Sequence, residues 1–257
     1  MQKYINKIKY LLNIYSNYQN WLYIITCRVR NKSINKVVLR SGVIVEGGVK
    51  SLVIDIVDEI FIREVYCPPF LKLNPHDVVV DIGANIGVFS LYSKLHGASR
   101  IVSVEPLDTN VKLINNNFRI NKFSLPEIAN IAISEKESEI NLYLYGHDSH
   151  AMLFKSDSEK NETDYKKVRG IRLSTLLKKY NLSRIDFMKI DCEGAEGYII
   201  KNSNKNNWKN IKKIAIEYHN NVSVLDNISI VKKLVSYGYK TKTLKSDDIY
   251  GYIYAWR

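Results

Sequence analysis

Length, composition and charge limit the class of protein before any motif is considered. The chain has 257 residues, 46% hydrophobic and 25% charged, which is enough to bury one sizeable core and to carry a smaller appendage. It has no run of 18 apolar residues and no signal-peptide pattern, so we expect neither a membrane span nor secretion. Cys27, Cys67 and Cys192 lack the spacing of a disulfide framework or a zinc site, so we expect a cytoplasmic protein without a bound metal.

The formal net charge of +12 at pH 7 is unevenly distributed, because the first forty residues contain eight Lys and Arg and no acid. Residues 3–29 also place apolar side chains mostly three and four positions apart, which predicts one amphipathic helix with an apolar stripe to cover. This helix could cap the rest of the chain, dimerise or make peripheral contact with a membrane, and the pattern favours no particular oligomeric state. Ordinary solvated charges are the alternative explanation of the basic stretch.

A short β-hairpin is predicted after this helix. Residues 37–39 and 43–45 are apolar, and Arg40-Ser41-Gly42 between them supplies a glycine turn. We place the end of this N-terminal appendage near Pro68-Pro69. The chain is thus divided into residues 1–69, with the helix and hairpin, and residues 70–257, with the main domain.

From Asp77 onward, short β-branched runs alternate with longer helical stretches. This pattern predicts a doubly wound α/β fold, in which helices cover both faces of a mostly parallel sheet. Two final runs have no helix between them and are predicted to form an antiparallel pair, and residues 156–167 are charged enough for a mobile loop. The expected strands are 78–82, 101–105, 127–131, 185–191, 213–218, 239–244 and 250–256, and the expected helices are 87–95, 108–120, 174–180, 195–201 and 226–237.

The strongest functional signal joins the first of these strands to its helix, and reads Asp81-Ile82-Gly83-Ala84-Asn85-Ile86-Gly87. The glycines let the backbone turn sharply and approach a ligand, and the helix start offers unpaired N–H groups. Because the acid precedes the first glycine, it can face a positively charged amino or sulfonium group instead of a pyrophosphate. This order favours S-adenosylmethionine over NAD.

Acids also follow the later strands. Glu105-Pro106 lies eighteen residues past Gly87, where a carboxylate can accept hydrogen bonds from both ribose hydroxyls of an adenosyl group. A surface acid before a loop is the alternative reading of Glu105. The fourth strand ends in Asp191 and Glu193, and two acids beside a core are costly unless something pairs with them.

The fifth strand ends in Glu217-Tyr218-His219. His219 could be a general base, because an unperturbed imidazole titrates close to neutral pH. A strand-end histidine in a surface hydrogen bond explains the same residue equally well.

Together these motifs resemble the FkbM-type methyltransferase family. The resemblance implies a class I, Rossmann-like methyltransferase fold with seven strands, S-adenosylmethionine as cofactor, and O-methylation of a hydroxyl, often on sugars, glycans or polyketide-like products. It covers roughly residues 64–218 and rests on DIGANIG at 81–87, Glu105-Pro106, the Asn-rich helix after it, NIAIS at 130–134, KIDCEGAE at 189–196 and the E-x-H triplet from Glu217.

By matching position, the resemblance also implies that Asp191, Glu193, Glu217 and His219 face the methyl-transfer centre. Our hypothesis is that His219, or else Asp191, removes the acceptor proton, while Glu193 and Glu217 hydrogen-bond the acceptor. The chain departs from the family at 107–110 and in the loop 146–167, which we expect to be an acceptor-binding flap. The residues expected to hold the cofactor are Asp81, Gly83, Asn85, Gly87, Glu105, Pro106 and Asp191, with Asn130 or Ile131 near the adenine.

Three other functions are alternatives for this sequence. A nicotinamide-dependent oxidoreductase would need a strict G-x-G-x-x-G loop, which is absent. A nucleic-acid methyltransferase would suit the basic composition, but base methylation usually uses an Asn/Asp-Pro-Pro-aromatic segment where this chain has Asp191-Cys192-Glu193-Gly194. A non-catalytic relic of the fold, binding membrane or nucleic acid through its basic N-terminus, is disfavoured by the retained acids and glycines.

Overall fold

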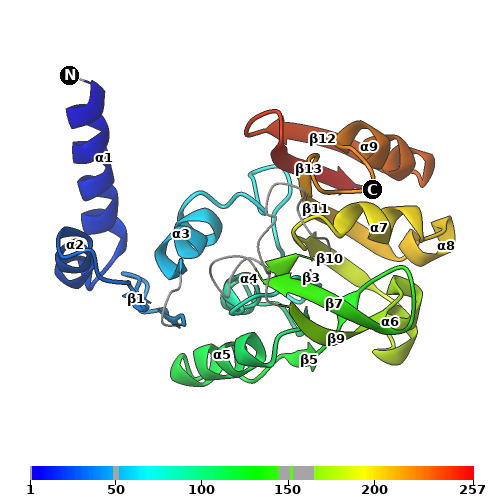
Figure 1. The fold of residues 1–257 in the computed structure, drawn as a ribbon, viewed down its shortest axis with the longest axis horizontal. Coiled ribbons are helices and arrows are strands. Elements are labelled where there is room, and N and C mark those ends of the chain that lie inside the picture. Colours follow the sequence, from blue (N-terminus) through cyan, green and yellow to red (C-terminus); the bar gives the residue numbers. More distant parts are fainter. Residues whose placement is uncertain (1, 49–51, 145–150, 153–164) are drawn as a thin grey trace.

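The computed structural model describes residues 2–48, 52–144, 151–152 and 165–257. Its central feature is a seven-stranded sheet in the order β12-β13-β11-β10-β3-β4-β5, in which only β13 runs antiparallel to its neighbours (Figure 1). The doubly wound fold and the antiparallel C-terminal pair are therefore confirmed. The strands are β3 (Val78–Ile82), β4 (Arg100–Val104), β5 (Glu127–Ala129), β10 (Ile185–Ile190), β11 (Ile211–His219), β12 (Lys240–Lys245) and β13 (Tyr250–Trp256).

Two hydrophobic cores lie on opposite faces of this sheet, because alternate residues of each strand point to opposite sides. Val79 of β3 packs with α4 (Val88–Leu95) and α5 (Asp108–Ile120), together with the N-terminal segment. Val80, the next residue, belongs to the core on the other face. That second core is covered by α6 (Leu173–Lys179), α7 (Glu196–Lys201), α8 (Lys205–Trp208) and α9 (Asn227–Ser236).

The N-terminal segment forms two helices, α1 (Gln2–Asn17) and α2 (Trp21–Val29), so the prediction of one helix over 3–29 was wrong. The helix is interrupted between them because residues 19 and 20 form hydrogen bonds with a neighbouring strand. Gln19 N–H donates to the carbonyl of Val38, and the Asn20 side chain accepts from the Val38 N–H. None of the described helices is both long and apolar enough to cross a lipid bilayer.

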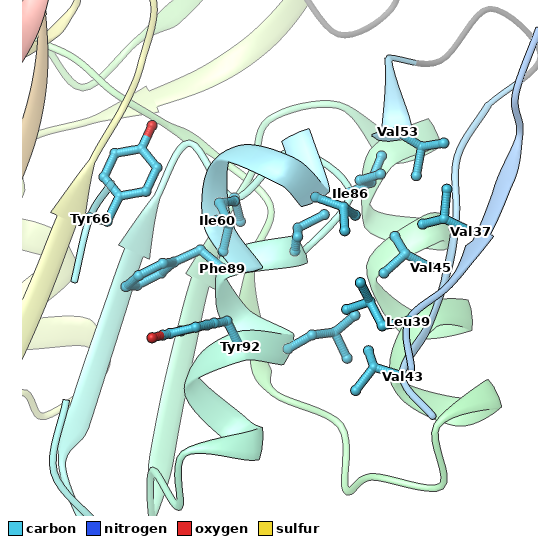
Figure 2. Close-up of a cluster of buried hydrophobic side chains, with 14 of the residues drawn as sticks. Val37, Leu39, Val43, Val45, Val53, Ile60, Tyr66, Ile86, Phe89 and Tyr92 are labelled. Carbon is cyan, nitrogen blue, oxygen red and sulfur yellow. The ribbon is translucent and has the colours of Figure 1, made fainter. Parts of the chain in front are cut away.

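The predicted hairpin is confirmed as β1 (Lys36–Val38) and β2 (Ile44–Glu46), with Gly42 at φ +89° in the turn. Two short elements that the sequence pattern did not predict follow it: α3 (Val53–Val57) and the π-helix η1 (Asp58–Ile62). Figure 2 shows side chains of the hairpin, η1 and α4 in a single apolar cluster. The N-terminal segment thus shares the core of the sheet, while the boundary at residue 69 stays a prediction.

A second, smaller sheet was missed by the sequence analysis. The strand expected at 127–131 ends at Ala129, and the chain then enters a sheet with the order β6-β9-β7-β8. The expected flap at 146–167 and mobile loop at 156–167 lie mostly outside the described residues. The four strands of the smaller sheet are β6 (Ala132–Ile133), β7 (Glu139–Leu144), β8 (Ala151–Met152) and β9 (Tyr165–Ile171).

Candidate active site

An open cavity of about 630 Å³ lies at the carboxyl ends of β3, β4 and β10. This is the edge where open parallel sheets bind ligands, next to the point at which strand order reverses. Its walls combine apolar side chains, such as Val104 and Ile131, with the carboxylates of Glu105, Asp191 and Glu193. Of the other residues predicted to hold a cofactor, Gly83, Asn85 and Pro106 also line it.

The loop after β3 requires glycine at two positions. Gly83 has φ +77°, and a Cβ built on it would lie 1.7 Å from the carbonyl oxygen of Asp191. Gly87 has φ +84° where α4 begins, and its Cβ would lie 3.1 Å from the side chain of Ile114. A side chain at either position would be strained by the left-handed backbone and would crowd a neighbour. The two glycines therefore let the loop pass close to the backbone of Asp191 and to α5.

Glu105 is held rigidly at the cavity wall. Its Oε1 accepts from the Leu107 N–H (2.9 Å) and the Asn110 side chain (3.2 Å), and its Oε2 accepts from the Asn85 N–H (2.8 Å). Burial raises the pKa of Glu105 to about 7, against the opposing effect of these donors. Asn130 donates to the carbonyls of Glu105 and Pro106, so it fixes this turn from outside the cavity lining.

Asp81 is completely buried. It lines neither the cavity beside Glu105 nor a second cavity that adjoins it. Its Oδ1 lies 3.3 Å from Nζ of Lys189, and its Oδ2 accepts from the Ser90 hydroxyl at 2.7 Å. The cation that Asp81 faces in this structure is therefore the chain's own Lys189, and the role of Asp81 in holding the cofactor stays a prediction. Lys189 also donates to the Gly83 carbonyl at 2.8 Å and lies 3.3 Å from Oδ2 of Asp191, so it joins three parts of the site.

A second cavity, of about 810 Å³, adjoins the first, and Asn85, Asp191 and Glu193 line both. One wall comes from residues 52–66 of the N-terminal segment, which the sequence analysis had not connected with the site. A signal in the sequence could have revealed this wall. Asp55, Glu59 and Arg63 are spaced four residues apart, which puts three charged residues on one face of a helix.

The Tyr66 hydroxyl lies between two carboxylates of the second cavity. It is 2.9 Å from Oδ2 of Asp191 and 2.6 Å from Oε2 of Glu217. A phenol has one proton, so two hydrogen bonds to ionised carboxylates cannot both form, and one carboxyl must be protonated. Burial and the nearby acids raise the pKa of Glu217 to about 8. Burial acts against ionisation of Asp191 too, but Lys189 and His219 outweigh it and lower the pKa of that carboxyl. Glu217 is therefore the group that holds the extra proton.

His219 lies behind the acids and lines neither cavity. Its Nδ1 lies 2.9 Å from Oε1 of the buried Glu196, and its backbone N–H donates to the same oxygen at 2.8 Å. Its Nε2 is 3.5 Å from Oε2 of Glu193. Burial alone would lower the pKa of His219, but Glu196 and then Glu193 and Asp191 raise it to about 10. The imidazole is thus protonated at neutral pH, which does not fit the hypothesis of a general base. Glu196, which the sequence analysis had not assigned to the site, holds this cation in place.

Comparison with known proteins gives an independent view of the chain. A family model of the methyltransferase FkbM domain matches residues 81–241. Methyltransferase sdnD of Sordaria araneosa is 27% identical over 188 residues, which span 62% of this chain and 72% of that protein. The 31-O-demethyl-FK506 methyltransferase FkbM of Streptomyces tacrolimicus is 25% identical over 191 residues, which span 63% of this chain and 72% of the relative.

A solved structure shares the fold. The crystal structure of methyltransferase FkbM from Methylobacillus flagellatus KT aligns with a TM-score of 0.52 at 17% sequence identity. The alignment covers 74% of this chain but only 46% of that longer chain.

Proposed function

The chain belongs to the FkbM methyltransferase family, and we propose that it transfers a methyl group from S-adenosylmethionine to a hydroxyl oxygen of a small-molecule, sugar or glycan acceptor. The cofactor is the one this family uses. The observation that carries the proposal is the meeting of two cavities at Asn85, Asp191 and Glu193. One cavity has the character of a nucleoside site, and the other can hold an acceptor beside it.

The lining of the first cavity suits the chemistry of S-adenosylmethionine. Glu105 Oε2 accepts one hydrogen bond from the protein, so the carboxylate keeps lone pairs for ribose hydroxyls. Val104, Ile131 and Leu142 supply apolar walls suited to an adenine ring. When bound, the cofactor supplies a methyl group on a positively charged sulfur. Asp191 and Glu193, at the junction of the cavities, favour that positive charge.

The second cavity is rich in hydrogen-bond acceptors. Five carboxyl groups, among them the protonated Glu217, line it against two cations, Arg63 and Lys189, and Lys189 is already paired with Asp81 and Asp191. Carboxylates accept hydrogen bonds from hydroxyl groups, which suits a sugar-like acceptor. The same carboxylates repel an anion, so this lining speaks against a nucleic-acid substrate despite the basic composition.

Within this arrangement we assign the proton transfer to Asp191. Methyl transfer to a hydroxyl releases one proton, and Asp191 is an ionised carboxylate at the junction of the two cavities. Tyr66 and Lys189 hold it in position. Protonated Glu217 donates its proton to the Tyr66 hydroxyl, so its other oxygen is left to accept from an acceptor hydroxyl. His219 holds Glu193 as a positioning residue. Orientation contributes most, because effective molarities reach about 10⁵–10⁸ M while a general base contributes roughly 10²–10⁴-fold.

The test is a transfer assay with S-adenosylmethionine that carries a labelled methyl group. Neutral sugars, amino sugars, polyketide-like alcohols, nucleotides and RNA are offered separately, and the methylated product is located by mass spectrometry. We expect labelling of a hydroxyl oxygen in one of the uncharged or cationic groups, and a loss of turnover in Asp191→Asn by roughly 10²–10⁴-fold. Labelling of RNA or of a nitrogen atom would overturn the proposal.

A further inference from the structure

We propose that the helical pair α1 and α2, residues 2–29, binds the surface of membranes that contain anionic lipids. The proposal concerns a different part of the molecule from the methyl-transfer site and does not depend on it. Three observations support it: the exposure of apolar side chains, the way α1 leaves the body of the protein, and a cationic sequence without acids.

Large apolar side chains are exposed on both helices. On α1, Leu12 is 57% exposed and Tyr15 is 54% exposed. On α2, Leu22 is 62% exposed and Val29 is 79% exposed. Single exposed apolar residues are ordinary on protein surfaces, but a group of them on adjoining helices indicates an interaction site.

The base of the pair is fixed to the body of the protein, whereas the described side chains one turn earlier in α1 are exposed. Ile14 and Tyr18, near the C-terminal end of α1, are buried, and the Tyr18 hydroxyl donates to Oδ1 of Asp58 at 2.7 Å. Residues 9–12, one turn earlier, are all exposed, and Figure 1 shows α1 projecting away from the sheet. Isolated helices of this length are marginal in water, so α1 would gain from a surface that covers its apolar residues.

The charge of this region selects the kind of surface. The first acid of the chain is Glu46, and eight Lys and Arg precede it. Among the described residues, Lys9, Arg30 and Lys32 are exposed cations of the two helices and the turn after them. Each cation near an anionic leaflet strengthens binding by about fivefold, which is the effect of roughly 1 kcal/mol.

An anionic membrane fits both properties at once. Nucleic acid would pair with the cations but would leave Leu12, Leu22 and Val29 in water. A second copy of the same helices could cover the apolar residues but would bring two cationic segments together, which costs free energy. At a lipid interface the apolar side chains enter the acyl boundary, and the cations stay with the headgroups.

The test is sedimentation of the full-length protein with lipid vesicles. We expect binding to vesicles of phosphatidylcholine mixed with phosphatidylglycerol, weak binding to phosphatidylcholine alone, and loss of binding at high salt. The triple variant Lys9→Glu, Arg30→Glu, Lys32→Glu and the double variant Leu12→Asp, Leu22→Asp should each bind at least about tenfold more weakly. Unchanged affinity for S-adenosylmethionine would show that the variants are folded.

Matched controls make the same kinds of change elsewhere, with Asp in place of exposed apolar residues and Glu in place of exposed cations. Ile228→Asp with Val235→Asp alters α9 residues that are 59% and 52% exposed, and Lys205→Glu, Lys240→Glu and Lys245→Glu remove three other exposed cations. These controls should bind vesicles as the unaltered chain does. The proposal is overturned if the chain ignores anionic vesicles, or if the control variants weaken binding as much. It is also overturned if light scattering shows a dimer that Leu12→Asp with Leu22→Asp dissociates, or if RNA binds in preference to the vesicles.

Discussion

The hydroxyl of Tyr66 lies 2.6 Å from Oε2 of Glu217, although 151 positions separate the two residues in the sequence. The N-terminal segment therefore supplies part of the site at the edge of the sheet. Tyr66 is buried and its hydroxyl also lies beside Asp191, so a change at Tyr66 should alter the chemistry of both acids.

Replacing Tyr66 with Phe should reduce turnover much more than cofactor binding. The variant removes the donor to ionised Asp191, and a hydrogen bond to a charged group contributes about 1.5–3 kcal/mol, or roughly 10- to 100-fold in rate. Initial rates and calorimetry with S-adenosylmethionine measure the two effects separately. Tyr254→Phe is the matched control, because Tyr254 is also buried but its hydroxyl donates to the carbonyl of Val65. Equal rates in the two variants would rule out a role for Tyr66 in positioning Asp191.

The stability of the protein should depend on pH through Glu217. Its pKa in the folded state is about 8, above the ordinary 4.5, so the folded state holds this proton more tightly than the unfolded chain. The stabilising contribution is full below about pH 4.5 and is lost as the pH rises through about 8. Glu217→Gln removes this dependence, so the variant should become more stable relative to the unaltered protein as the pH rises over that range. Urea unfolding at several pH values measures it, and a difference that stays constant with pH would contradict it.

His219 should remain protonated well above neutral pH. Its pKa is raised from the ordinary 6.5 to about 10, chiefly by the contact with Glu196, which outweighs the effect of burial. Nitrogen-15 NMR of the imidazole groups, assigned with His219→Gln, reports the charge directly. Glu196→Gln should lower the pKa of His219. A resonance that titrates near 6.5 in the unaltered protein would restore His219 as a candidate base.

Alanine at position 83 should be far more damaging than alanine at position 238. Both glycines have positive φ, +77° and +95°, so both substitutions incur the left-handed backbone cost of about 1–2 kcal/mol. Only Gly83→Ala also drives a Cβ into the Asp191 carbonyl, while Gly238 has nothing within 4 Å. We expect Gly83→Ala to show the larger loss of unfolding free energy and to lose cofactor binding. Similar losses in the two variants would mean that the close approach at Gly83 is unimportant.

The sheet could be predicted from the sequence because its strands are short, apolar and separated by helical periodicity. Val78–Ile82 was predicted with its observed bounds. The smaller sheet was missed because β9 is mostly exposed in its first five residues, so no apolar pattern marks it. The break between α1 and α2 was missed because its cause is tertiary: the hairpin strand at Val38 pairs with Gln19 and Asn20.

The candidate site was partly predictable for a related reason. Parallel strands end at one edge, so Glu105, Asp191 and Glu217 could be assigned to the same edge from their positions at or just after strand ends. The direction in which each side chain points, and the groups that it contacts, could not be predicted. Asp81 was expected to face a cofactor, and the structure shows that it faces Lys189, a partner that the motif pattern does not reveal. A lysine in a strand that is expected to be buried is itself a sign of a buried ion pair.

The central claim is that the cavity beside Glu105 binds S-adenosylmethionine, and calorimetric titration tests it most directly. The unaltered chain, Glu105→Ala and Glu127→Ala are titrated with S-adenosylmethionine and with NAD. Glu127 is the matched control, because it is an exposed acid on the neighbouring strand β5 and pairs with Arg100. We predict that the unaltered chain and Glu127→Ala bind S-adenosylmethionine alike and that Glu105→Ala binds it at least about tenfold more weakly. Binding of NAD in preference, or equal binding of S-adenosylmethionine by Glu105→Ala, would contradict the account.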